Sequence, residues 1–240
     1  MATYVLVPGA WLGAWAWRDV TAALRADGHT VHPLTLTGLA DRAHLGGPDV
    51  DLETHVADIT TLIAAEELTD AILVAHSYAG LPVGLAADRI GSRLSHVVYV
   101  DSAPLGEGMT MFDLTGPEAE AGIRAAAAAG DGWGIPYQDL AEQPQPPTGL
   151  TADHLPELTR RATPHPLGAY AQAVHYTHTD PGTPQQVEIA CEDFRTLLDA
   201  GNPAVSFIDE SWQRFDLDTG HWPMFSQPKE LAAVLSGLGR

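Results

Sequence analysis

The hydrophobic residues of this chain follow two patterns, one typical of buried strands and one typical of amphipathic helices. Short, continuous apolar runs of strand length end at Gly, Pro or Asp, and longer segments between them carry apolar residues on one helical face. Strands that alternate with helices predict a mostly parallel sheet that is covered on both faces. In the first half, this pattern predicts strands over 4–7, 30–36, 71–75 and 94–100, and helices over 19–27, 52–65 and 81–90. Pro33 places the second of these strands near an edge of the sheet.

The alternation stops near Leu105 and resumes near residue 181. Residues 106–180 contain a five-alanine run, Ala125–Ala129, and a stretch rich in Pro and Gln, and we interpret them as an inserted helical cap with loops. The pattern then predicts strands over 185–190 and 212–217, and helices over 194–200 and 228–238. The chain is therefore expected to form one α/β domain over 1–240, with a core of residues 1–105 and 181–240 and a cap of residues 106–180.

The segment from Ala71 to Leu81 has the layout of a nucleophile elbow, in which a serine lies on a tight strand-to-helix turn. Such a turn needs small residues two places before and two places after the serine, and Ala75 and Ala79 flank Ser77 in this way. Alanine and glycine are so common in this chain that the pattern alone decides little. Its position after a predicted strand and before a predicted helix makes Ser77 the candidate nucleophile.

A serine hydroxyl needs a base, usually histidine, and the base needs a carboxylate that fixes its tautomer. For a serine at the sheet top, these partners follow later strands in the order serine, acid, histidine. His221 lies between the last predicted strand and the last predicted helix and is the candidate base. Asp193 follows the strand over 185–190 and is the candidate acid, with Asp209 and Glu192 as alternatives. Asp218 is too close to His221 in the chain, and His76 is expected to be packed or hydrogen-bonded with its side chain directed away from Ser77.

An oxyanion hole requires two backbone N–H groups that point at the developing negative charge. The residue after the nucleophile, Tyr78, usually supplies one of them, and a loop after an early strand supplies the other. That loop contains Ala10, whose N–H is our candidate because Pro8 has none. Three further residues are predicted to line the substrate pocket, namely Trp11, Trp222 and Ser102.

Composition narrows the function classes. The formal net charge is −19, so neither nucleic acid nor an anionic membrane surface is expected as a partner. The single cysteine, Cys191, excludes an intrachain disulfide and is expected to be a small core residue. Because no stretch approaches the length of an apolar membrane span and the N-terminus lacks the pattern of a signal peptide, we expect a cytoplasmic location.

Several segments of this sequence resemble the α/β-hydrolase superfamily. Within it, they resemble the plant methylesterase and hydroxynitrile lyase group and its small bacterial esterase relatives. The resemblance is carried by segments 4–11, 13–15, 36–38, 52–59, 75–80, 191–193 and 220–224. It implies an α/β-hydrolase fold, oxyanion N–H groups from Ala10 and Tyr78, and an acid about 28 residues before the histidine, the separation between Asp193 and His221. The chain departs from the family by Pro8 in place of a histidine and by alanines in place of both elbow glycines.

The resulting hypothesis is a serine hydrolase that cleaves a carboxylic ester of a small, mostly apolar molecule through an acyl-enzyme on Ser77. It needs neither a cofactor nor a metal, and the pair His175 and His178 has no evident third ligand. Two alternatives stay open: a lyase or cyclase that uses Ser77 and His221 without an acyl intermediate, and a non-catalytic binding protein on the same scaffold. The sequence does not predict the substrate or the oligomeric state.

Overall fold

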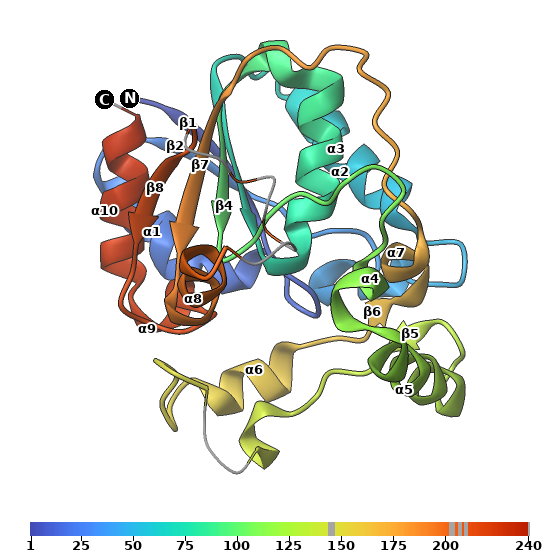
Figure 1. Ribbon diagram of the computed structural model, residues 1–240. Helices are drawn as coiled ribbons and strands as arrows, with labels where there is room; N and C mark the ends of the chain where they lie inside the picture. The colour runs from blue at the N-terminus through green and yellow to red at the C-terminus, as the bar shows by residue number, and fades with distance from the viewer. Residues whose placement is uncertain (144–146, 202–204, 206–207, 209–210, 240) are drawn as a thin grey trace.

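A computed structural model describes residues 1–143, 147–201, 205, 208 and 211–239 of the chain, without the side chain of Asp193. Its centre is a sheet of six strands in the order β2-β1-β3-β4-β7-β8, in which every neighbouring pair is parallel (Figure 1). The strands are β1 (Thr3–Val7), β2 (Thr30–Pro33), β3 (Ala71–His76), β4 (Leu94–Val100), β7 (Gln185–Ala190) and β8 (Gln213–Asp216). The predicted parallel sheet is therefore confirmed, and so is the edge position of the strand that ends at Pro33.

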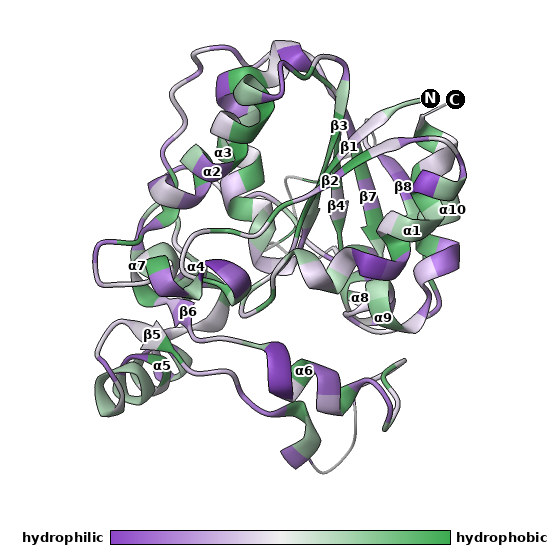
Figure 2. Ribbon diagram, turned by 180° about the vertical axis from the view of Figure 1, so that it is seen from behind, coloured by the Kyte–Doolittle hydropathy of each residue, from purple (hydrophilic) through white to green (hydrophobic). Residues whose placement is uncertain are grey.

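Successive side chains of the strands enter two separate cores, one on each face of the sheet. On β3, Leu73 and Ala75 pack with helices α2 (Leu52–Ala65) and α3 (Gly80–Ile90). Ile72 and Val74 point to the opposite face and pack with α1 (Arg18–Ala26) and α10 (Pro228–Leu238). Burial on both faces explains why this strand is a continuous apolar run, and Figure 2 shows green, hydrophobic residues along β3 at the centre of the sheet.

Within the predicted cap, residues 106–180, the helices lie beyond the carboxyl ends of the strands, and the segment after α7 runs back along α3 toward the amino end of β7 (Figure 1). The elements of the cap in the described residues are α4 (Met111–Thr115), α5 (Pro117–Ala129), β5 (Gly134–Ile135), α6 (Leu155–Arg161), β6 (His165–Pro166) and α7 (Leu167–Ala171). The two short strands form an antiparallel ladder that the sequence pattern did not predict, because two residues are too few to show a period.

The remaining described elements connect the sheet to its surroundings. Two more helices follow β7 and β8, and 3₁₀ turns bridge several loops. These elements are α8 (Glu192–Asp199), α9 (Pro223–Ser226), and 3₁₀ turns at Ala14–Trp17, Ala40–Leu45, Ser77–Ala79, Gly91–Arg93 and Leu140–Glu142. Among the helices in the described ranges, none is both long and apolar enough to cross a membrane.

Buried histidines connect the cap to the sheet. The His165 ring on β6 is fully buried, and neither of its nitrogens has a hydrogen-bond partner among the described residues. It packs on the Tyr78 ring with a centroid distance of 4.4 Å. Burial lowers the pKa of His165 well below its usual value, and burial also lowers the pKa of His55. For His76, burial and the neighbouring charge of His221 lower the pKa to about 3.

These shifts predict that the fold loses stability in mild acid. A histidine with a depressed pKa stays neutral in the folded state, while the unfolded chain takes up the proton below pH 6.5, so the stability present above that pH is lost as the pH falls. His76 alone should lower the free energy of unfolding by about 2 kcal/mol between pH 7 and pH 5. Urea unfolding at the two pH values measures the loss, which His165→Phe should reduce and His44→Asn, at an exposed site, should not. An equal loss in His165→Phe would contradict the prediction.

Candidate active site

Ser77 lies on a sharp turn at the carboxyl end of β3. Its φ angle is 54°, in the left-handed region that non-glycine residues rarely adopt, and a 3₁₀ turn and α3 follow directly. The flanking Ala75 and Ala79 are fully buried, which explains why both positions carry small side chains. Gly9 in the facing loop and Gly80 have no room for a Cβ atom, which would approach the Ser77 Cβ to 2.9 Å and the Ala103 carbonyl oxygen to 2.2 Å, respectively. The chain around Ser77 therefore forms the tight strand-to-helix turn that the sequence predicted.

His221 is held between Ser77 and a carboxylate. Its Nε2 lies 2.9 Å from the Ser77 Oγ, and its Nδ1 lies 2.5 Å from Oδ2 of Asp101. The ring comes from the loop between β8 and α9. Its backbone carbonyl accepts a 2.7 Å hydrogen bond from Nε2 of His76. His76 is therefore the hydrogen-bonded histidine that the sequence predicted, and it supports the loop that carries His221.

Asp101 is the first residue after β4, and its φ angle of 47° turns the chain sharply at that point. It is 5% exposed, and its Oδ1 accepts the backbone N–H of Cys191 at 2.9 Å. Burial alone would raise the pKa of Asp101, but the hydrogen bond and charge of His221, together with the Cys191 N–H, outweigh this effect and lower it. Asp101 is thus a buried carboxylate in its ionised form, the group that an imidazolium requires as a partner.

The carboxylate that the structure describes at Nδ1 of His221 is Asp101 and not the predicted Asp193, whose role as the acid stays a prediction. A neutral imidazole that accepts a proton at Nε2 has a single hydrogen at Nδ1, and Asp101 receives it. Asp193 is the second residue of α8, and its side chain lies outside the described residues. Of the alternatives, Asp209 also lies outside them, and the exposed Glu192 donates its backbone N–H to the Thr219 carbonyl.

A sequence signal for Asp101 did exist. It satisfies the order serine, acid, histidine, and it directly follows an apolar strand, as Asp193 nearly does. The strand pairing makes the difference, because Val100 lies opposite His76 on the neighbouring strand and therefore brings Asp101 beside Ser77. The end of the strand next to β3 thus supplies the carboxylate that the structure describes at Nδ1 of His221.

The two predicted oxyanion donors belong to the turn at Ser77 and to the loop after β1. Tyr78 is the second residue of the 3₁₀ turn that starts at Ser77, so its N–H belongs to the first N–H groups of the turn, which have no partner within it. Its side chain is fixed, because the hydroxyl lies 2.8 Å from Nδ1 of His55, whose Nε2 lies 2.9 Å from the Thr37 carbonyl. Ala10 is 5% exposed and lines a hollow that also contains Ser77 and His221.

Two hollows share Ser77 and His221 in their linings and otherwise have different walls. The first, about 240 Å³, contains Ser102 together with residues of the cap and α8. The second, about 160 Å³, contains Trp11 and Trp222. The three predicted pocket residues thus line hollows that contain the reactive pair, but they belong to two different hollows.

Ser102 has a second contact that sequence reasoning missed. Its hydroxyl donates a hydrogen bond to the backbone carbonyl of Ser77 and is buried at 4% exposure. Removing a donor to a buried carbonyl typically costs about 1–3 kcal/mol. We expect Ser102→Ala to lower the free energy of unfolding by about this amount and kcat for any accepted ester by about tenfold, because the elbow loses an anchor. Ser92→Ala, which removes an exposed serine hydrogen bond to Asp180, is the control, and equal effects of the two changes in a kinetic and urea assay would contradict this role.

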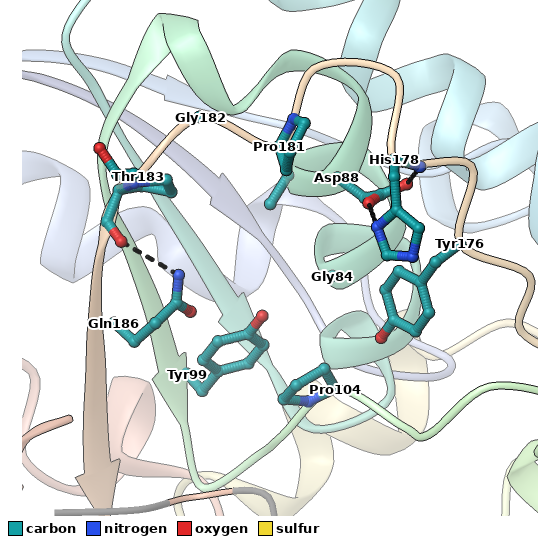
Figure 3. A pocket seen from close by; sticks show the side chains of 12 residues that line it. Gly84, Asp88, Tyr99, Pro104, Tyr176, His178, Pro181, Gly182, Thr183 and Gln186 are labelled. Carbon is teal, nitrogen blue, oxygen red and sulfur yellow. Dashed lines mark hydrogen bonds and ion pairs between the residues drawn. The ribbon is translucent and has the colours of Figure 1, made fainter. Parts of the chain in front are cut away.

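Another hollow, of about 420 Å³, lies away from Ser77 and His221 between α3, β4 and the segment before β7 (Figure 3). The Asp88 carboxylate beside it is already occupied: Oδ1 lies 2.9 Å from Nδ1 of His178, and Oδ2 accepts the backbone N–H groups of Thr177 and His178. These hydrogen bonds hold the segment that contains Thr177 and His178 against α3. His175 pairs instead with Glu107, so His175 and His178 contact different carboxylates.

A parallel sheet with a serine, a histidine and a carboxylate at its carboxyl edge defines the class of α/β hydrolases. The chain matches the alpha/beta hydrolase family over residues 4–234 and belongs to it. It is 36% identical to the "Carbendazim hydrolyzing esterase" of Nocardioides over 254 residues, which cover 100% of both chains. It is 30% identical to "Methyl jasmonate esterase 1" of Vitis vinifera over 265 residues, covering 97% of this chain and 94% of the relative.

The solved structures agree on the fold. An extracellular α/β-hydrolase from a Paenibacillus species superimposes with a TM-score of 0.83 at 17% identity and with full coverage of both chains. The relatives confirm the resemblance to the plant methylesterase group and to bacterial esterases. The chain is therefore a carboxylesterase-like hydrolase.

Proposed function

We propose that the protein hydrolyses the ester bond of a small, mostly apolar molecule with Ser77, His221 and Asp101 as its catalytic residues. The observation that carries the proposal is the line of contacts through one imidazole, with the Ser77 Oγ at one ring nitrogen and Asp101 at the other. A neutral His221 accepts the serine proton at Nε2, and Asp101 holds the hydrogen at Nδ1 and stabilises the imidazolium that forms.

The reaction proceeds in two steps. The Ser77 Oγ attacks the ester carbonyl carbon while its proton passes to His221, and the oxyanion receives hydrogen bonds from the N–H groups of Ala10 and Tyr78. The tetrahedral intermediate then expels the alcohol, which takes the proton from His221, and leaves an acyl group on Ser77. A water molecule then gives a proton to His221 and attacks the acyl carbon. When this second tetrahedral intermediate collapses, the carboxylic acid leaves and the proton passes from His221 back to the Ser77 Oγ. No step uses a cofactor.

Two further points support an ester as the substrate. The relatives are named for the hydrolysis of carbendazim and of methyl jasmonate. Both hollows beside Ser77 have mainly apolar walls, which suits an uncharged organic molecule. The absence of nucleic-acid and membrane partners and a cytoplasmic location stay predictions from composition.

The test combines a mechanism-based probe with a turnover assay. A fluorophosphonate should label Ser77 and abolish hydrolysis of p-nitrophenyl acetate in proportion, and mass spectrometry of the peptide that contains Ser77 should show one added phosphonyl group. Rapid mixing with p-nitrophenyl acetate should show a burst of p-nitrophenol if deacylation is slower than acylation. A protein that is not labelled and turns over none of a panel of aryl esters would favour the binding-protein alternative.

A further inference from the structure

The two hollows that share Ser77 and His221, here called the outer and the inner chamber, indicate which groups the substrate carries. The outer chamber, about 240 Å³, is lined by Leu81, Leu105, Met111, Leu114, Phe194 and Leu197 besides the catalytic residues. The inner chamber, about 160 Å³, is lined by Trp11, Leu12, Tyr137, Leu140, Leu158 and Trp222. Ser77 and His221 belong to both linings. An ester carbonyl at the Ser77 Oγ therefore has apolar space on each side of its scissile bond.

Two exposed leucines mark the way in. Leu114 on α4 is 43% exposed and Leu197 on α8 is 39% exposed, although both line the outer chamber. Large apolar side chains at the surface are costly to hydrate, and a group of them next to a cavity indicates a ligand path. These two leucines come from the cap and from the core, so the outer chamber opens to solvent between the two.

The chamber volumes set the size of the groups. An apolar protein cavity of about 150 Å³ accepts benzene, whereas one water molecule occupies about 30 Å³. The inner chamber, at about 160 Å³, therefore has room for a single ring or a short chain, and the outer chamber has room for somewhat more. Both are several times larger than the methyl group of a methyl ester.

We infer that the preferred substrate is an ester with an apolar group of about ring size on each side of the scissile bond, one in each chamber. The substrate enters between Leu114 and Leu197. This inference rests on the proposed function and extends it, because a methyl ester fills only one chamber. Burial of the second group should favour the bulkier ester, since transfer of apolar surface from water is favourable in proportion to its area.

The test is a set of four esters that differ on one side at a time: methyl acetate, benzyl acetate, methyl hexanoate and benzyl hexanoate. We expect kcat/KM for benzyl hexanoate to exceed those for benzyl acetate and methyl hexanoate by about tenfold or more each. Benzyl hexanoate hydrolysed no faster than both singly enlarged esters would overturn the inference.

Variants assign the chambers. Leu158→Phe fills the inner chamber and should reduce the increase in kcat/KM that comes from enlarging one side of the ester, either the acyl or the alcohol group. Leu114→Trp, at the mouth of the outer chamber, should reduce the increase that comes from enlarging the other side. Leu140→Phe replaces Leu158→Phe if the latter does not fold. Leu45→Trp is the matched control, because Leu45 is 47% exposed and lines neither chamber.

If both variants lost the increase in kcat/KM for the same group of the ester, the two-chamber arrangement would be contradicted. The proposed function has its own readout, because fluorophosphonate labelling of Ser77 depends on neither chamber being filled by an ester. Labelling without discrimination among the four esters overturns the inference alone, whereas absence of both labelling and hydrolysis overturns the proposed function.

Discussion

We expect Ser77→Ala to lower kcat for p-nitrophenyl acetate by about 10⁶-fold and to abolish fluorophosphonate labelling. Removal of the serine of such a triad has an effect of this size because the acyl-enzyme route is lost entirely. His221 and Asp101 keep their contact in this variant, but the imidazole has no hydroxyl to deprotonate. The measurement is a steady-state assay together with intact-protein mass spectrometry after exposure to the probe.

The loss must be separated from unfolding. Alanine at position 77 has the same positive φ as serine and removes only the Oγ, so the melting temperature should change little. Ser92→Ala is the matched control, since its hydroxyl contacts Asp180 at the surface, and it should retain full labelling and turnover. Labelling that survives in Ser77→Ala would place the nucleophile at another residue.

The elbow was predictable from the sequence because its constraints are local. A buried strand, small residues at positions 75 and 79, and a following helix all lie within a short segment. The parallel sheet was predictable for the same kind of reason, since each strand is a continuous apolar run that needs cover on both faces. His221 followed because a histidine between the last strand and the last helix reaches the same sheet edge as Ser77.

The acid and the pocket were not predictable in this way, because they depend on distances between segments. Asp101 and Asp193 both come after strands that end at the same edge, and the pairing of Val100 with His76, which the sequence does not reveal, places Asp101 beside Ser77. The chambers combine side chains of the cap and the core, such as Leu114 with Leu197. The cap has two-residue strands and short helices, whose positions no periodicity fixes.

Asp101→Asn should lower kcat by about 10⁴-fold, the loss seen when the orienting carboxylate of a triad becomes an amide. The reason is specific to the contacts of this residue. Oδ1 accepts the Cys191 N–H, so an asparagine that keeps this bond turns its NH₂ group toward Nδ1 of His221. Nδ1 must then act as an acceptor, the ring hydrogen moves to Nε2, and the imidazole no longer accepts the proton of Ser77. The substitution leaves the shape of the site unchanged and reverses the tautomer.

Asp193→Asn is the decisive comparison, because the two carboxylates compete for one role. If Asp101 orients His221, Asp193→Asn should change kcat by less than about threefold, because the carboxylate that holds the Nδ1 hydrogen is then unchanged. Asp218→Asn, which loses an exposed ion pair with Arg195, should behave in the same way. The reverse result, a large loss in Asp193→Asn and a small one in Asp101→Asn, would restore the acid to the end of β7. The contact between Asp101 and His221 would then hold the His221 loop in place without orienting the ring for proton transfer.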